Sequence, residues 1–152
     1  MSQGSEGQPP QPTRSMNQFD VLIGEWVTVS THPQLPSAMH GHATFEWLKD
    51  GALLLWSDWV EGEDVPSAYS VIGHDDAAEG CTMLYTDGRG VARIYQMSLE
   101  GGVWKMWRDS ADFSQRMTAT FSDDNNTINW RGEMSQDGST WEEDLSMTLT
   151  RK

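Results

Sequence analysis

The stretch LIGEW, residues 22–26, decides the fold of this chain. A glycine and a tryptophan flank one acidic residue, and the β-branched run VTVST (27–31) follows at once. Such runs favour extended strands, and Gly24 lets the chain turn into a strand without a Cβ clash. The residues just before, NQFDVLI (17–23), have the pattern of one helical turn. We therefore expect a short helical turn that leads directly into a first strand, with Trp26 near its start.

Almost every later segment has the composition of a strand bounded by a tight turn. Asp50-Gly51 separates two strand-like runs, and this dipeptide is a strong hairpin signal in that setting. No segment carries a convincing apolar period of 3.6 residues, so no long helix is expected. The further strands are expected at 38–48, 52–61, 67–74, 81–87, 91–99, 103–109, 115–122, 127–135 and 140–150.

Short turns in regular succession pair neighbouring strands antiparallel, in up-and-down order. A sheet of this kind loses its exposed edges most simply by closing on itself. The pattern therefore predicts an all-β fold, an antiparallel up-and-down β-barrel of about ten strands with a short N-terminal helical turn. A β-sandwich is the alternative, but it would need longer crossover connections than the sequence offers.

The length of 152 residues fits one domain. Residues 1–16 are mostly polar and rich in Pro, Gln, Gly and Ser, so we expect a disordered tail there and the barrel domain at 17–152. No stretch approaches the ~20 apolar residues of a membrane-spanning helix. Cys81 is the single cysteine, so no intrachain disulfide can form. This is compatible with the reducing cytoplasm, the location that we expect.

The formal net charge is −13, from 23 acidic against 10 basic residues. A field of this sign repels phosphate backbones and anionic lipid surfaces. We therefore expect neither nucleic acid nor a membrane as a partner. The expected partner is a small-molecule ligand, and the expected state is a monomer or a homodimer.

Eight tryptophans and nine methionines stand out in a chain of this length. Aromatic residues at this density either fill a wide interior or line a ligand pocket. Trp56, Trp59 and Trp104 are the candidates for a pocket wall, with ordinary packing as the alternative. A barrel of about ten strands encloses more volume than an eight-stranded one, which side chains can nearly fill, so room for a ligand is expected.

The Gly24-x-Trp26 pattern at the start of the first strand, after one helical turn, resembles the signature of lipocalins and their calycin relatives. In that superfamily the tryptophan packs across the closed end of the barrel, and a basic residue near the end of the last strand commonly lies over it. Arg151 is the matching position here. The resemblance thus implies a cation–π contact that ties the two ends of the sheet together.

Over the core, roughly residues 17–151, the chain is similar to small bacterial lipocalin-like proteins of unassigned function. The runs that carry this similarity are TFEWL, IGHDD, LYTDGRGVARIYQMS, VWKMWRD, FSQRMTATFS and SQDGSTWEEDL. The same superfamily includes fatty-acid-binding proteins and the nitrobindins, which carry haem on a histidine near the C-terminus. This chain departs from that pattern, because it has no histidine after His74. Haem binding of the nitrobindin kind is therefore not expected.

Side chains alternate between the two faces of a strand, so inward and outward positions can be counted off. In the run VARIYQMSL, Arg93, Tyr95 and Met97 share the face with the larger side chains. Arg108 falls on the corresponding face of the next strand, VWKMWRD. Arginine and tyrosine side chains that converge in an apolar interior are typical of a small-molecule site. Such arginines can hold a carboxylate, phenolate or carbonyl oxygen.

The last strand adds a carboxylate to this cluster. Counting places Glu143 on the face with the large apolar residues and leaves Asp144 on the solvent face. An unpaired carboxylate is expensive in apolar surroundings, although one β-bulge would reverse the assignment. Tyr85 and Asp87, on the adjoining strand, complete the polar cluster. The alternative is a structural network in which these charges neutralise one another.

We expect the barrel to bind a small, largely apolar molecule with an anionic or carbonyl group. The alternative is a cofactor-independent enzyme, a cyclase, isomerase or proton-transfer catalyst, with Glu143 or Asp87 as the base and Tyr95 or Arg93 stabilising an oxyanion. The expected ligand-binding residues are Arg93, Tyr95, Arg108, Tyr85, Trp56, Trp59, Trp104, Met97, His42 and Glu143.

No cofactor and no metal are expected. His40 and His42 lie two residues apart on a predicted strand, but no third ligand is apparent. A haem protein that uses one of these histidines or a methionine is the least favoured interpretation. Motifs for a catalytic nucleophile or a phosphate-binding glycine loop are absent from the sequence.

Overall fold

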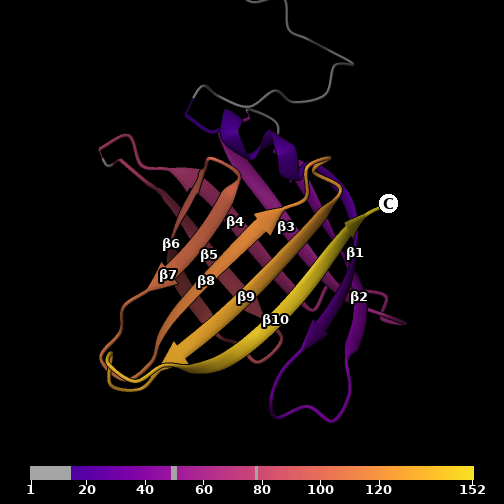
Figure 1. Ribbon diagram of the computed structural model, residues 1–152. Helices are drawn as coiled ribbons and strands as arrows, with labels where there is room; N and C mark the ends of the chain where they lie inside the picture. The colour runs from indigo at the N-terminus through magenta and orange to yellow at the C-terminus, as the bar shows by residue number, and fades with distance from the viewer. Residues whose placement is uncertain (1–14, 49–50, 78) are drawn as a thin grey trace, which may run out of the picture.

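Ten antiparallel strands close into one barrel (Figure 1). The structure, a computed structural model, describes residues 15–48, 51–77 and 79–152. Each strand pairs with its neighbours in sequence, and β1 closes the barrel against β10. The strands are β1 (Gly24–Thr31), β2 (Met39–Trp47), β3 (Leu53–Val60), β4 (Ala68–His74), β5 (Cys81–Asp87), β6 (Ala92–Glu100), β7 (Val103–Arg108), β8 (Ser114–Phe121), β9 (Thr127–Ser135) and β10 (Glu142–Arg151). The predicted up-and-down barrel is confirmed, and the sandwich is excluded.

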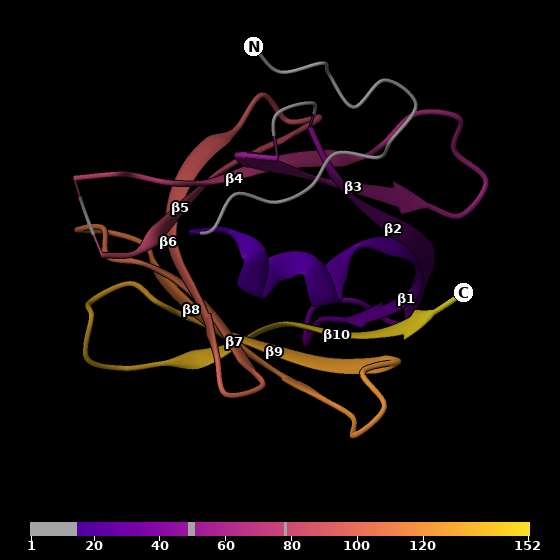
Figure 2. The ribbon, with the colours of Figure 1, turned by 90° about the horizontal axis from the view of Figure 1, so that it is seen from above.

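A short 3₁₀ helix, η1 (Asn17–Leu22), lies across one end of the barrel (Figure 2). Phe19 and Leu22 are fully buried, and so is Met16 just before the helix. The sequence predicted Met16 as the last residue of a disordered tail, but its side chain is packed in the core. Residues 1–14 of that tail lie outside the described residues. No helix in the described ranges is long and apolar enough to cross a membrane.

Trp26 and Arg151 join the first strand, the last strand and η1. The Arg151 Cζ atom lies 4.2 Å from the centroid of the Trp26 ring. The same guanidinium donates to the backbone oxygens of Val21, at 2.7 Å, and Ile23, at 2.8 Å. Trp26 Nε1 donates to the backbone oxygen of Leu22 at 2.8 Å. The contact that the sequence resemblance implied is therefore present at the closed end of the barrel.

The part of the interior next to η1 is filled by packed side chains. An aromatic cluster of Phe45, Trp56, Trp104 and Trp130 lies there, with ring centroids 5.1–6.2 Å apart. Such offset and tilted ring contacts add to the stabilisation that area burial supplies. Trp56 and Trp130 also border an open cavity. These two tryptophans of the aromatic cluster thus form the floor of that cavity.

Candidate functional site

A cavity of about 830 Å³ occupies the part of the barrel away from η1. It reaches the loops at that end, because Gln34, Ser67 and Phe113 lie on its wall. Strand β1 begins beside η1 and ends at Thr31, so these loops lie at the opposite end of the barrel. The wall is mainly apolar. It includes Trp56, Trp130, Phe113, Leu145 and the methionines Met39, Met83, Met106, Met117, Met134 and Met147.

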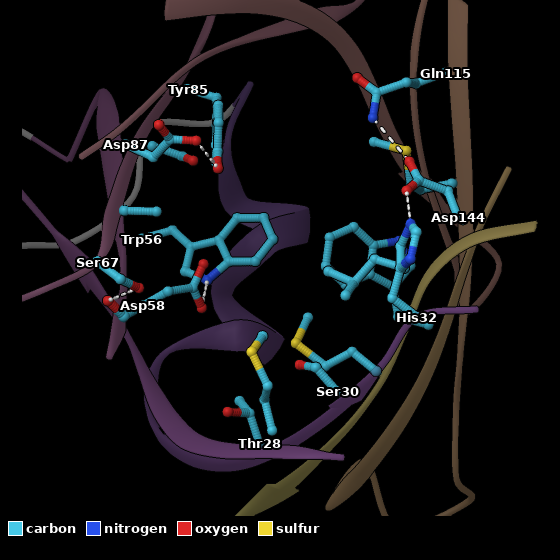
Figure 3. A pocket seen from close by; sticks show the side chains of 18 of the residues that line it. Thr28, Ser30, His32, Trp56, Asp58, Ser67, Tyr85, Asp87, Gln115 and Asp144 are labelled. Carbon is cyan, nitrogen blue, oxygen red and sulfur yellow. Dashed lines mark hydrogen bonds and ion pairs between the residues drawn. The ribbon is translucent and has the colours of Figure 1, made fainter. Parts of the chain in front are cut away.

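One side of the cavity carries Tyr85 and Asp87 in contact (Figure 3), and Arg89 also lies on this wall. Arg89 Nη2 donates to Asp87 Oδ2 at 2.7 Å, and the Tyr85 hydroxyl donates to the same oxygen at 2.7 Å. These hydrogen bonds, from Arg89 first, hold the pKa of Asp87 well below its usual range. Burial and the neighbouring Asp87 raise the pKa of Tyr85. Asp87 thus stays anionic and is a weak base, which disfavours the catalytic role predicted for it.

Asp58 on β3 faces the same cavity, close to its floor (Figure 3). Trp56 Nε1, two residues away on the same strand face, donates to Asp58 Oδ1 at 3.1 Å. Within the described ranges Asp58 forms no ion pair. Burial outweighs the Trp56 hydrogen bond and raises the pKa of Asp58 from 3.8 to about 7. A cavity carboxyl group that titrates near neutral pH can both take up and release a proton.

The facing side carries a chain of hydrogen bonds that crosses several strands (Figure 3). His32 Nε2 lies 3.1 Å from Asp144 Oδ1, and Gln115 Nε2 donates to Asp144 Oδ2 at 3.0 Å. The Tyr95 hydroxyl donates to Gln115 Oε1 at 2.5 Å, and burial raises the pKa of Tyr95. The Gln34 backbone N–H donates to His32 Nδ1, so the proton of neutral His32 lies on Nε2 and points at Asp144. Both ring nitrogens are occupied, and His32 positions Asp144.

Asp144 reaches the cavity because β10 is bulged. The pairing of β10 with β9 shifts register between Glu143 and Ser146, and regular alternation is broken there. Gly132 on β9 makes room, since a Cβ at that position would lie 2.8 Å from the Leu145 backbone oxygen. Asp144 consequently lines the cavity, while Glu143 is exposed. The predicted faces of Glu143 and Asp144 are therefore wrong, and Glu143 is not placed to bind a cavity ligand or to act as its base.

Two arginines lie near Tyr95, Arg93 on the same strand and Arg108 on β7. Arg93 lines the cavity, and its Cζ atom is 5.1 Å from the centroid of the Phe113 ring. Arg108 Cζ is 5.9 Å from the centroid of the Tyr95 ring. Its Nε is buried and has no hydrogen-bond partner among the described residues. Neither arginine forms an ion pair in that part of the chain, and both border a smaller pocket of about 490 Å³ on β6 and β7.

Four other predicted ligand-binding residues lie in the core, on the outer face or at the border of the cavity. Trp104 and Met97 are buried in the hydrophobic core and do not line the cavity. His42 does not line it either, because it alternates with the buried residues of β2 and faces outward. Trp59 borders the cavity, but its ring stacks on that of His42 with centroids 5.1 Å apart. The structure thus corrects the prediction for Trp104, Met97, His42 and Arg108, because none of the four lines this cavity.

Counting along strands missed both carboxyl groups that matter most here. Asp58 alternates with the buried residues Leu54 and Trp56 on the inner face of β3, so a face assignment of that strand contained the signal. Asp144 carried no such signal, because a bulge places it against the alternation. His32 and Gln115 could be recognised only through their contacts with Asp144.

The comparison with known proteins identifies the fold of this chain but not its function. No protein-family model matches the sequence, and no curated protein matches it. The crystal structure of Rv2717c from M. tuberculosis matches with a TM-score of 0.64 at 11% identity, covering 93% of this chain and 99% of that one. The S-type phycobiliprotein lyase CPES from Guillardia theta matches with a TM-score of 0.58 at 7% identity, covering 88% and 90%. Both matches cover most of this chain, so the predicted lipocalin-like barrel is confirmed as a fold.

Proposed function

We propose that the barrel binds a small, largely apolar molecule with an anionic or carbonyl group in the cavity away from η1. The observation that carries this proposal is Arg93, a cation on the wall of a cavity of about 830 Å³, with no carboxylate partner among the described residues. An arginine in such a place holds an anionic or carbonyl oxygen by charge-assisted hydrogen bonds. Arg108 does not line this cavity; with Arg93 it borders the smaller pocket on β6 and β7, and its Nε has no hydrogen-bond partner among the described residues.

The rest of the cavity suits the apolar body of such a ligand. Methionine side chains are unbranched and polarizable and adapt to irregular shapes. Trp56 and Trp130 offer aromatic surfaces at the floor. Tyr85 and Tyr95 border the same space near Arg93 and add polar groups at that end. A few polar groups in an apolar wall are the common anatomy of a ligand pocket.

The structural neighbours support this general class of function. CPES, which has a similar barrel, is a phycobiliprotein lyase, so a barrel of this form is compatible with an enzyme. Together with the cavity, this favours a ligand-handling barrel over a purely structural one. From the charge and the single cysteine we further propose a cytoplasmic monomer or homodimer without nucleic-acid or membrane partners.

Titration with 2-naphthoate and with its neutral methyl ester tests the role of Arg93, because the two compounds share one ring system and differ in charge. We expect the carboxylate to bind at least ~10-fold more tightly, since a hydrogen bond to a charged group contributes ~1.5–3 kcal/mol. Arg93→Gln should remove this preference and leave the affinity for the ester within about twofold.

Arg116→Gln is the matched control. It makes the same charge change on the outer surface, where Arg116 pairs with Glu133 and lies over the Trp141 ring. This variant should keep both affinities. Saturable binding of neither compound to the wild-type protein, or an undiminished preference for 2-naphthoate in Arg93→Gln, would contradict the proposed function.

A further inference from the structure

Asp58 lies in a niche of small residues on the cavity wall. Its cross-strand neighbours are Ala43 on β2 and Ala68 on β4, and both alanines are buried. Gly41, on the same face of β2 as Ala43, also borders the cavity, and a Cβ there would collide with the Trp59 backbone oxygen. With only small residues on the two flanking strands, the Asp58 carboxyl group borders the cavity next to the Trp56 ring (Figure 3).

A hydrogen bond orients this carboxyl group, but no cation among the described residues pairs with it. Trp56 Nε1 holds Oδ1 at 3.1 Å, while Oδ2 has no hydrogen-bond partner in residues 15–48, 51–77 and 79–152. The other two carboxylates of the cavity, Asp87 and Asp144, each bind polar side chains through both oxygens. A purely structural carboxylate is normally paired in this way. The second oxygen of Asp58 is instead available to a molecule in the cavity.

We propose that Asp58 is a general acid–base group that exchanges a proton with a molecule bound in the cavity. The substrate class is a largely apolar molecule with a weakly acidic C–H or O–H group that lies toward β3. This inference rests on the proposed function, because a proton can be exchanged only with a molecule that the cavity accepts. It adds a reaction to that function and assigns the base to a residue that counting along the sequence had overlooked.

The surroundings of Asp58 suit this role. A general base is most effective when its pKa lies near the working pH, and burial raises the pKa of Asp58 to about 7. The titratable and charged side chains that share the cavity wall are His32, His40, Tyr85, Asp87, Arg89, Arg93, Tyr95 and Asp144. None of them forms a hydrogen bond or an ion pair with Asp58. The flanking positions on β2 and β4 hold alanines, so burial governs the titration of Asp58.

5-Nitrobenzisoxazole is a small apolar probe for a base of this kind. The Asp58 carboxylate takes the C3 proton, and the electrons of that C–H bond form the third bond of a nitrile. The N–O bond breaks at the same time and leaves its electron pair on a phenolate oxygen. Asp58 then gives its proton to water, and no oxidant or reductant is involved. The product, a cyano-nitrophenolate, absorbs visible light, so its release is measured directly.

We expect the wild-type protein to release this phenolate with saturation kinetics. Its kcat/KM should rise with pH, with a midpoint near the Asp58 pKa of about 7. Asp58→Asn keeps the acceptor for Trp56 Nε1 but removes the base, so kcat/KM at about pH 8 should fall at least ~50-fold. Asp123→Asn makes the same change at an exposed site in the β8–β9 turn. This control should retain kcat/KM within about twofold.

Binding of 2-naphthoate to the same samples separates the two proposals. If 2-naphthoate binds but the ring opening is no faster than in buffer, or Asp58→Asn keeps the wild-type rate, the acid–base assignment is wrong and the proposed function stands. If neither probe binds, both proposals fail. Should Asp58→Asn not fold, the wild-type pH profile decides, because a flat profile between about pH 5.5 and about pH 8.5 would contradict a base with this pKa.

Discussion

Folding raises the pKa of Asp58, so ionising this side chain costs free energy in the folded barrel. Its carboxyl group has an ordinary pKa of 3.8 and a pKa of about 7 in the folded barrel, because the surrounding protein desolvates the anion. The folded state therefore binds this proton more tightly than the unfolded chain does. The cost of ionising Asp58 is absent below about pH 4, grows as the pH rises and is complete above about pH 7.

Asp58→Asn should consequently stabilise the barrel at high pH. Asparagine keeps the hydrogen bond from Trp56 but cannot ionise. After allowance for solvent that reaches the cavity, we expect the free energy of unfolding to rise by on the order of 2 kcal/mol at about pH 8. The gain should disappear at about pH 4, where wild-type Asp58 is protonated. Urea unfolding at both pH values measures it, and equal stability at the higher pH would argue against the raised pKa.

Among the elements, β1 and β10 are joined at the closed end by Arg151. Its guanidinium lies over Trp26 and donates to the backbone oxygens of Val21 and Ile23. Arg151→Ala removes the cation–π contact and leaves these oxygens without their donor, so we expect a loss of about 2–4 kcal/mol in the free energy of unfolding. Arg131→Ala, at an exposed position of β9, should cost less than about 0.5 kcal/mol. Similar losses in the two variants would show that Arg151 does not hold the closure together.

The bulge of β10 depends on Gly132 of its partner strand. An alanine Cβ there would lie 2.8 Å from the Leu145 backbone oxygen. A backbone oxygen cannot move aside as easily as the end of a flexible side chain can. We expect Gly132→Ala to cost about 1–3 kcal/mol in the free energy of unfolding. Gly80→Ala is the control, because no atom lies within 4 Å of its added Cβ. Chemical unfolding of both variants measures the difference, and a Gly132→Ala barrel as stable as the control would mean that the bulge can shift at little cost.

Across the whole molecule, the architecture could be predicted because each strand and turn carries its own local signal. The Asp50-Gly51 hairpin signal and the regular turns defined the strand succession. The Gly24-x-Trp26 resemblance identified the closed end, where Arg151 lies over Trp26. Closure follows from these features, since an up-and-down sheet with two unpaired edges gains hydrogen bonds when its first and last strands meet.

The candidate site could be predicted only where strand pairing is regular. Alternation along β6 placed Arg93 and Tyr95 on the interior face, where the structure has them. It failed on β10, because the bulge exchanges the faces of Glu143 and Asp144. A bulge depends on a contact with a distant strand, here at Gly132, and that contact has no signature within β10 itself.

Methionine methyl groups report directly on whether a ligand enters the cavity. Met83, Met106 and Met147 lie on its wall, whereas Met16 and Met97 are buried in the core outside it. The measurement is an NMR titration of protein with isotope-labelled methionine methyl groups against 2-naphthoate. We predict saturable shifts at the three wall methionines and much smaller ones at Met16 and Met97. Saturation without shifts at the wall methionines, or with equal shifts at Met16 and Met97, would contradict ligand binding in this cavity.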